Sequence, residues 1–371
     1  MLQIQLARMA QILFLSYQLL KHFLKQLLSA RVVVPLGAAL FLLLVWLFQP
    51  LPPAYQLAGY AYRTVLIPRG ASLQAIADSL ATHGLLKQTN LFLFLGKLTG
   101  KDRRIKSGLV EVPVGLPPYA LLNYLARARP HLIKVTIPEG VRSEQVAAIL
   151  ARKVGVDSAR FMQLVRDSLF ARALGVQADN LEGYLLPETY LLPWQPDERE
   201  LVRMMVRNTL RLFEPDSIQQ RLHQLNMSIH QVLTLASIIE GEVMVDSERV
   251  LVSSVYHNRL RRGWRLQADP TIQFLLKGKP RRLTYRDLEI DSPYNTYRYS
   301  GLPPGPINNP GRRSILAALY PAPTDYLYFV ATGDGGHHFS RTQREHLIWK
   351  RKFDRIRRQV ARSRRKAASR R

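Results

Sequence analysis

The chain has 371 residues, a formal net charge of +26 and 47% apolar residues, which allows one large domain or two to three ordinary ones. It contains no cysteine, and this excludes a disulfide framework, a cysteine nucleophile and thiolate metal ligands. The positive charge raises nucleic acid as a partner. However, nine Lys or Arg lie in the last 17 residues, and no zinc-finger spacing or aromatic-basic groove motif accompanies the remainder. We therefore expect no nucleic-acid partner.

Residues 32–48, "VVVPLGAALFLLLVWLF", predict a transmembrane helix. The run has 17 residues without a charge, the lower limit for crossing a hydrocarbon core of roughly 30 Å. A cleaved signal peptide is the alternative, although "FQPLPPAY" is a poor small-residue cleavage site. Four basic residues and no acid precede the run, so the positive-inside bias places the N-terminus in the cytoplasm and the rest of the chain outside it. Residues 1–31 then form a cytoplasmic amphipathic segment on the membrane surface, and residues 49–62 form a linker.

A repeat predicts a LysM-like α+β module over residues 63–172. The stretch "VLIPRGASLQAIADSL" (65–80) matches "VTIPEGVRSEQVAAIL" (135–150) at an offset of 70 residues. Both are typical of a short β-branched strand, a turn at Ile-Pro-x-Gly and an amphipathic helix. Modules of this kind either bind cell walls or serve as scaffold, and the sequence leaves both interpretations open.

Residues 173–347 predict a larger mixed α/β catalytic domain, so the whole chain is expected to be of the α+β class. A long helix is expected at about 197–213, followed by helices through "LASIIEGE" and "SERVLVSSVYHNRL". Loops rich in Pro, Gly, Tyr and Asn lead to a predicted hairpin in "YLYFVATGDGGHHFS", whose Gly-Asp-Gly-Gly supplies the turn. Residues 348–371 are interpreted as a basic disordered tail, either solvated or attracted to a membrane.

The stretch "LASIIEGE" places two carboxylates at the end of an apolar helix. Ser228, with Gln231 three residues later, has the form of a capping box and predicts the start of that helix. With an advance of about 100° per residue, Glu240 falls inside the apolar stripe, at about 20° from Ile229, and Glu242 falls on the opposite face. Glu240 is therefore the acid that we expect to face the core.

A carboxylate in an apolar seam loses hydration, which raises its pKa and retains the proton that a general acid needs. We therefore interpret Glu240 as the candidate catalytic acid, with Gly241 leaving room beside it. The alternative is a structural ion pair with an arginine such as Arg249 or Arg259. The helix pattern alone does not decide between these two roles.

The loops that follow carry flat aromatic rings and polar side chains, which together suit the faces and hydroxyls of sugar rings. The candidate substrate-binding residues are Gln267, Asp269, Asn295 and Tyr297. Their alternative role is loop architecture, since Asp and Asn are common turn and cap residues. His337 and His338 have no HExxH pattern or closely spaced carboxylate, so we expect no metal and no cofactor.

Four stretches, in order, resemble those of the MltG/YceG-like endolytic murein transglycosylase family. They are "LASIIEGE", "NRLRRGWRLQADPT", "DSPYNTYRYSGLPPGPINNPG" and "PTDYLYFVATGDGGHHFS". The resemblance runs from about residue 65 to residue 346 and includes "LEGYLLPETY". The chain departs from the family pattern at Gly241, where a lysine often follows the catalytic glutamate.

The resemblance implies a single catalytic glutamate, matched by Glu240. It also implies cleavage of the β-1,4 bond between N-acetylmuramic acid and N-acetylglucosamine in nascent peptidoglycan, leaving a 1,6-anhydromuramyl end and helping to terminate strand elongation. The expected location is the bacterial inner membrane, by a single span, with the catalytic domain in the periplasm. Peptidoglycan strands are the expected substrate and cell-wall synthases are candidate partners. A non-catalytic peptidoglycan-binding scaffold is the alternative function.

Overall fold

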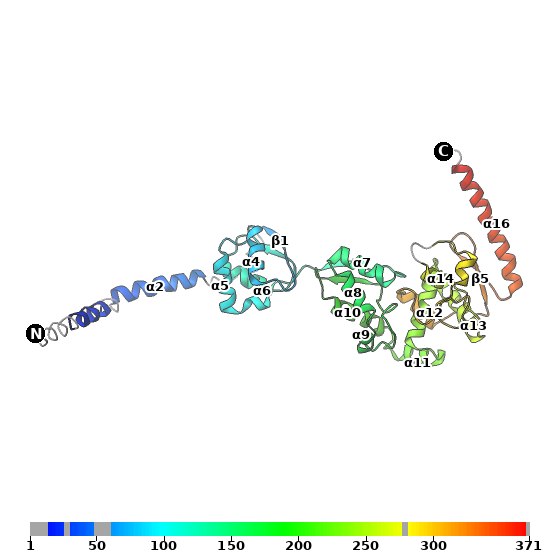
Figure 1. The fold of residues 1–371 in the computed structure, drawn as a ribbon, viewed down its shortest axis with the longest axis horizontal. Helices are drawn as coiled ribbons and strands as arrows, with labels where there is room; N and C mark the ends of the chain where they lie inside the picture. Colours follow the sequence, from blue (N-terminus) through cyan, green and yellow to red (C-terminus); the bar gives the residue numbers. More distant parts are fainter. Residues whose placement is uncertain (1–13, 26–29, 48–60, 277–280, 369–371) are drawn as a thin grey trace, which may run out of the picture. The chain divides into compact units, whose positions relative to one another are not determined.

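The computed structural model describes residues 14–25, 30–47, 61–276 and 281–368 of the chain. The chain divides into two compact units, one ending at His131 and the other beginning at Leu132 (Figure 1). The predicted α+β class is confirmed, since helices predominate and the strands of the described residues pair into three two-stranded antiparallel sheets.

The N-terminal segments that the structure describes are helical. Residues 14–25 form one helix, and α2 spans Ala30–Leu47. Judged by length and hydropathy together, none of the helices among the described residues qualifies as a membrane span. Residue 48 of the predicted span and most of the predicted linker lie outside the described residues, as do parts of the predicted amphipathic segment.

The first unit encloses a small core between one sheet and its helices. Its antiparallel strands place Val65 opposite Val110, and both side chains are buried. The side chain of Ser72 caps the first helix after the sheet by accepting a hydrogen bond from the N–H of Ala75. The elements are β1 (Tyr62–Ile67), α4 (Leu73–Thr82), α5 (Thr89–Thr99), η1 (Lys101–Arg104), β2 (Gly108–Pro113) and α6 (Pro118–Arg127).

Both copies of the repeat form the predicted strand, turn and helix. The turn glycines have left-handed backbones, with φ of +71° at Gly70 and +73° at Gly140, a conformation that suits glycine. The matched apolar residues of the two helices are buried in each copy; they are Ile76, Ala77 and Leu80 in the first and Val146, Ala147 and Leu150 in the second.

The predicted boundary of the first module is wrong, because the two copies of the repeat lie in different units. We expected residues 63–172 to form one module, whereas the division falls between His131 and Leu132. The strand of the second copy, β3 (Ile133–Thr136), pairs with β4 (Thr189–Leu192) and not with the sheet of the first unit. Its helix packs into the core of the second unit, so tertiary pairing overrides the repeat in the sequence.

The second unit is mostly helical, with β3 and β4 forming one sheet and a C-terminal hairpin forming another. Asp197 caps the predicted long helix, which begins one residue later. The remaining elements are α7 (Ser143–Val154), α8 (Ser158–Val165), α9 (Ser168–Ala173), α10 (Glu198–Arg211), α11 (Asp216–Leu225), α12 (Ile229–Glu242), η2 (Asp246–Glu248), α13 (Arg249–Arg261), α14 (Asp269–Leu275), η3 (Tyr285–Glu289), α15 (Arg312–Leu319), β5 (Tyr328–Ala331), β6 (His337–Ser340) and α16 (Gln343–Ala368).

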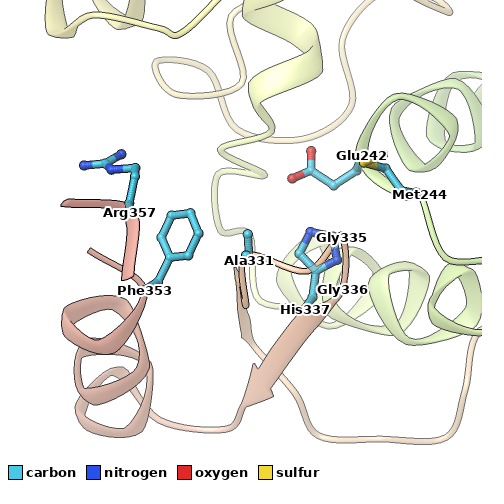
Figure 2. Close-up of a pocket in the computed structure, with 9 residues that line it drawn as sticks. Glu242, Met244, Ala331, Gly335, Gly336, His337, Phe353 and Arg357 are labelled. Atoms are coloured by element: carbon cyan, nitrogen blue, oxygen red, sulfur yellow. The ribbon is translucent and has the colours of Figure 1, made fainter. Parts of the chain in front are cut away.

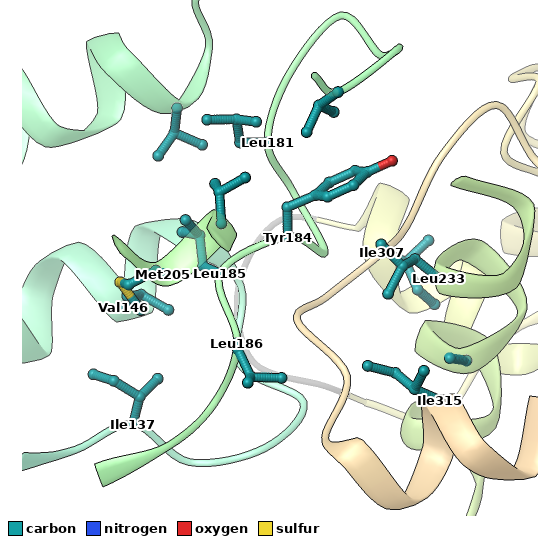
Figure 3. Close-up of a cluster of buried hydrophobic side chains, with 14 of the residues drawn as sticks. Ile137, Val146, Leu181, Tyr184, Leu185, Leu186, Met205, Leu233, Ile307 and Ile315 are labelled. Atoms are coloured by element: carbon teal, nitrogen blue, oxygen red, sulfur yellow. The ribbon is translucent and has the colours of Figure 1, made fainter. Parts of the chain in front are cut away.

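One hydrophobic core joins the two halves of the second unit, of which the first contains α7 and α10 and the second contains α12 and α15. The segment 181–186 passes between Val146 and Met205, from α7 and α10, on one side and Leu233 and Ile315, from α12 and α15, on the other (Figure 3). Burying these apolar side chains on both sides of a single segment stabilises the halves as one body. The site described below depends on that arrangement, because both halves contribute to it.

The predicted hairpin forms, but the predicted disordered tail is instead a helix. β5 pairs with β6 around a turn in which two glycines have φ of +100°. α16 follows and packs on the hairpin: the rings of His346 and Tyr328 lie 5.3 Å apart, and those of Trp349 and His338 lie 3.8 Å apart. This docking provides a helix nucleus, and the Arg, Lys, Gln and Ala residues beyond it have favourable helix propensity.

Candidate active site

α12 carries both acids of "LASIIEGE" and is buried along most of its length. The predicted capping box forms: Ser228 Oγ accepts from the Gln231 N–H at 3.2 Å, and Gln231 Oε1 accepts from the Ser228 N–H at 2.8 Å. Every residue from Val232 to Ile239 is buried, so this stretch has no solvent-facing side. The opposite face of the helix is therefore also a packed environment.

Glu240 is held in a structural ion pair. Its Oε1 lies 3.1 Å from Nη1 of Arg249, and its Oε2 accepts a hydrogen bond from the N–H of Gly311 at 3.0 Å. Only 7% of the Glu240 side chain and 9% of the Arg249 side chain are exposed. The ion pair with Arg249 that we considered as the alternative therefore forms, and the charge of Arg249 compensates Glu240.

Glu242, the last residue of α12, is the acid in a poorly hydrated site. Burial and the nearby charge of Asp269 raise the pKa of Glu242 from 4.5 to about 8, opposed by the charge of Arg259. Its Oε2 is buried and has no hydrogen-bond partner among the described residues. The carboxyl lines two cavities of about 350 Å³ and about 740 Å³. Its burial therefore favours the protonated form, and the residue borders both cavities.

The immediate neighbours of Glu242 explain why its proton is retained. Arg259 donates from Nε to the Leu327 carbonyl at 2.8 Å and from Nη1 to the Leu266 carbonyl at 2.5 Å, so these donors are directed away from the acid. A Cβ at Gly241 would lie 2.8 Å from Cβ of Pro270, so the room that we expected beside the acid is filled by proline.

Two of the four predicted substrate-binding residues lie beside Glu242. Asp269 begins α14 and lines the larger cavity together with Glu242. Tyr297 donates its hydroxyl to Oδ1 of Asp269 at 2.5 Å, and burial followed by this hydrogen bond raises the pKa of Tyr297. Tyr297 thus orients Asp269, whose negative charge favours the protonated form of Glu242.

The other two predicted residues shape the loop. Asn295 is fully buried; its Nδ2 donates to two backbone carbonyls, at 2.9 and 2.7 Å, and its Oδ1 accepts from the Tyr297 N–H at 2.9 Å. Gln267 is exposed and has a left-handed backbone with φ of +50°, and its N–H donates to the Thr296 carbonyl at 3.0 Å. Asn295 therefore positions the backbone of Tyr297, and Gln267 adopts the left-handed conformation that a turn of the loop requires.

The larger cavity continues as a groove lined by residues that no sequence motif predicted. A neighbouring cavity of about 450 Å³ shares Arg142, Glu144 and Phe274 with it. The guanidinium of Arg142 lies 4.7 Å from the ring centroid of Phe274, and the Tyr294 ring lies 4.9 Å from the same ring. Flat rings beside a cation suit sugars and carboxylates, but no local pattern in the sequence marks Arg142 or Phe274.

A second acid with a raised pKa lines this groove, but its oxygens are occupied. Burial raises the pKa of Glu182 from 4.5 to about 7, opposed by hydrogen bonds from the first residue of α7. Glu182 Oε1 also accepts from Nδ2 of Asn309 at 3.2 Å. The same buried amide accepts from the N–H groups of Gly183 and Leu185 and donates to the Val141 carbonyl, each at 3.0 Å. Asn309 and Glu182 thus connect residues 141–143, residues 182–185 and the segment of Asn309 into one wall of the groove.

Glu248 holds the β5–β6 turn beside the smaller cavity. Its Oε1 accepts from the His337 N–H at 2.8 Å, and its Oε2 lies 2.7 Å from His337 Nδ1. His337 lines the cavity with Glu242 (Figure 2), whereas His338 stacks on Trp349. Across the described part of the chain, no cluster of three or more His, Asp or Glu side chains could hold a metal ion.

The arrangement has counterparts among known proteins. The sequence pattern of the YceG-like family matches residues 65–352. A protein from Bacillus subtilis (strain 168) named endolytic murein transglycosylase is 33% identical over 305 residues, covering 77% of this chain and 83% of its own. One of the same name from Streptococcus pneumoniae serotype 2 (strain D39) is 28% identical over 317 residues, covering 77% of this chain and 57% of its own. The crystal structure of a yceG-like protein from Listeria monocytogenes superposes with a TM-score of 0.54 at 32% identity, covering 78% of this chain and 99% of that one. The predicted resemblance is thereby confirmed, and the chain belongs to the YceG-like family.

Proposed function

We propose that this chain is an endolytic murein transglycosylase in which Glu242 is the general acid. The observation that carries the proposal is the protonated Glu242 carboxyl lining two cavities, in a family whose relatives bear that name. The bond cleaved is the β-1,4 link between N-acetylmuramic acid and N-acetylglucosamine, and the new end is 1,6-anhydro-N-acetylmuramic acid. Ends of this kind help to terminate elongation of the strand.

In the proposed reaction, Glu242 donates its proton to the bridging oxygen as the bond from that oxygen to the muramyl C1 breaks. The C6 hydroxyl of the same muramyl sugar bonds to C1, and the Glu242 carboxylate accepts the hydroxyl proton. One carbon–oxygen bond breaks and one forms, no water is consumed, and the acid regains its proton. A single carboxyl therefore suffices, whereas hydrolytic glycosidases ordinarily use two.

The position of Glu242 suits cleavage within a strand. The two cavities that it lines allow a polymer to extend in both directions from the reacting bond. The larger one continues past Arg142 and Phe274 for further sugar units. The negative charge of Asp269 raises the pKa of Glu242 and so favours the protonated acid before the reaction.

The test incubates uncrosslinked glycan strands with the full-length chain and with its Glu242→Gln variant. Wild-type products should be lighter by one water than hydrolysis products. Glutamine keeps the shape of the side chain but has no acidic proton, so the rate should fall by at least about 100-fold. Wild-type rates from Glu242→Gln would remove the assignment, and ordinary reducing ends would indicate a hydrolase.

Glu240→Gln is the matched control, since it changes the other acid of the same helix in the same way. It should weaken the ion pair with Arg249 and lower stability, yet still yield anhydro ends. If the wild-type chain bound sacculi without cutting them, the alternative of a non-catalytic scaffold would be favoured.

We further propose that residues 32–48 anchor the chain in the bacterial inner membrane, with the second unit in the periplasm. The support is the charge-free run of 17 residues and the basic residues before it. The first unit is proposed to be a LysM-like wall-binding module, supported by its small sheet and flanking helices, and cell-wall synthases are proposed partners. Membrane fractionation, with protease protection of tags at each end, tests the anchor and its orientation.

A further inference from the structure

α16 forms a wall of the cavity that contains Glu242, although its C-terminal part lies beyond the family pattern. That pattern ends at residue 352. Phe353 and Arg357, one helical turn apart, line the smaller cavity together with Glu242 and His337. Figure 2 shows Phe353 and Arg357 on the side of this cavity opposite the Glu242 carboxyl. Two residues that follow the end of the family pattern thus line the cavity opposite the proposed acid.

The position of α16 is set by contacts with the hairpin. Trp349 stacks on His338 of β6, one turn before Phe353. The turn of the same hairpin is held by Glu248 through His337, close to the end of α12. Helix and hairpin are therefore linked by direct side-chain contacts, and both line the cavity together with Glu242, so the cavity wall is a built part of the second unit.

Arg357 is suited to bind a carboxylate from a ligand. Its Nη2 lies 3.0 Å from Oδ1 of Asp354 on the same helix, in a pair whose side chains are 46% and 30% exposed. Such exposed pairs are weak, so a ligand carboxylate can replace Asp354. The guanidinium carbon lies 5.9 Å from the ring centroid of Phe353, so a flat apolar face adjoins the cation. Together they offer a surface for a sugar ring and a donor pair for an acid.

We propose that Phe353 and Arg357 form a substrate subsite in which Arg357 binds a carboxylate of the peptide stem on a muramyl sugar. This rests on the proposed function and specifies its substrate. In strands that carry stems, the lactyl carboxyl of the muramyl sugar is tied up in an amide bond, so the free carboxylates lie on the stem peptides. A cation in the cavity of Glu242 therefore recognises these carboxylates, and the enzyme prefers strands that carry them over strands in which they have been amidated.

An anionic membrane surface is the competing partner for so basic a helix, which has 11 Lys or Arg and 2 acids between residues 343 and 368. A lipid surface would attract the whole helix and depend on Arg357 no more than on its neighbours. Arg358 is also exposed, but it is not among the residues that line the cavity of Glu242. That difference favours the substrate as the partner of Arg357.

The experiment compares full-length wild type, Arg357→Gln and Arg358→Gln on two substrates. One is uncrosslinked glycan strands with peptide stems, and the other is the same strands after chemical amidation of the stem carboxylates. For Arg357→Gln, KM on strands with free stem carboxylates should rise about tenfold because a charge-assisted hydrogen bond is lost, while kcat stays unchanged; on amidated strands wild type and Arg357→Gln should have the same KM. Arg358→Gln should match wild type on both substrates.

The outcomes separate this inference from the function on which it rests. If wild type cuts strands and Arg357→Gln has an unchanged KM on stem-bearing strands, the subsite is refuted and the function stands. If Arg357→Gln and Arg358→Gln lose the same amount of cleavage activity, and only when vesicles containing anionic lipid are present, the helix binds the membrane and the subsite is refuted. If wild type cuts neither substrate, the proposed function fails. Direct binding of the two strand types to wild type and Arg357→Gln then decides the subsite on its own.

Discussion

Replacing Glu242 by glutamine should change how the stability of the second unit depends on pH. The native state retains the Glu242 proton up to a pKa of about 8, whereas the unfolded chain releases it from 4.5. Between these values the unfolded state binds fewer protons, so wild-type stability falls as pH rises. Glutamine has no such proton, and the variant is free of this contribution to the pH dependence.

The size of the effect follows from the shift in pKa. Each pH unit between the two pKa values of Glu242 corresponds to about 1.4 kcal/mol, so the relative gain of the variant is near zero at pH 4.5 and about 3 kcal/mol at pH 7. Above pH 8 it levels off at about 5 kcal/mol. A constant offset from the altered packing of the amide adds equally at every pH.

Urea unfolding followed by tryptophan fluorescence measures this difference. Trp194, Trp264 and Trp349 all lie in the second unit, and residues 62–131 contain no tryptophan. The urea midpoint of the variant, relative to that of wild type, should be about 1 M higher at pH 7 than at pH 5. Glu144→Gln, which removes an exposed carboxyl from the same groove, controls for the loss of a charge. Parallel midpoint curves for wild type and Glu242→Gln from pH 5 to 8 would refute a buried, protonated acid.

Three further predictions concern the same helix. The kcat/KM of the wild type should be level below pH 8 and fall about tenfold per unit above it, because the acid Glu242 must be protonated; Asp269→Asn should move this fall to lower pH, and an unmoved profile would contradict the coupling. Arg249→Met should destabilise the second unit by about 3–5 kcal/mol in urea unfolding, since it leaves Glu240 buried and unpaired; a loss below 1 kcal/mol would mean that water reaches the carboxylate. Gly241→Ala should destabilise by about 1–3 kcal/mol, because its Cβ would meet the proline of α14 at 2.8 Å; an unchanged melting temperature would show that α14 shifts freely.

Local features of the fold could be predicted where the chemistry is local. The capping box at Ser228, the glycine turn of the hairpin and the strand–turn–helix repeat depend on residues a few positions apart, and all three form as expected. The module boundary could not be predicted in this way. It depends on β3 pairing with β4, more than fifty residues later, which no local pattern specifies.

The sequence pointed to α12 for the candidate acid, but its helical pattern could not show which of the two carboxylates is paired with a cation. A helical wheel assumes one solvent-facing side, and α12 has none between Val232 and Ile239. Which acid is compensated depends on Arg249 and Gly311, which tertiary packing brings to Glu240. The helical state of residues 348–368 was missed for a similar reason, because it depends on Trp349 docking on the hairpin.

The buried amide of Asn309 has a consequence for the order of folding. It bonds to Val141 and to Gly183 and Leu185, segments that leave the ribosome more than a hundred residues before it. Until that amide arrives, the early segments lack a partner for their backbone groups. Assembly of the wall is therefore a late event in the life of a nascent chain, and chains interrupted before this residue should be open to proteolysis at the turn around Gly183.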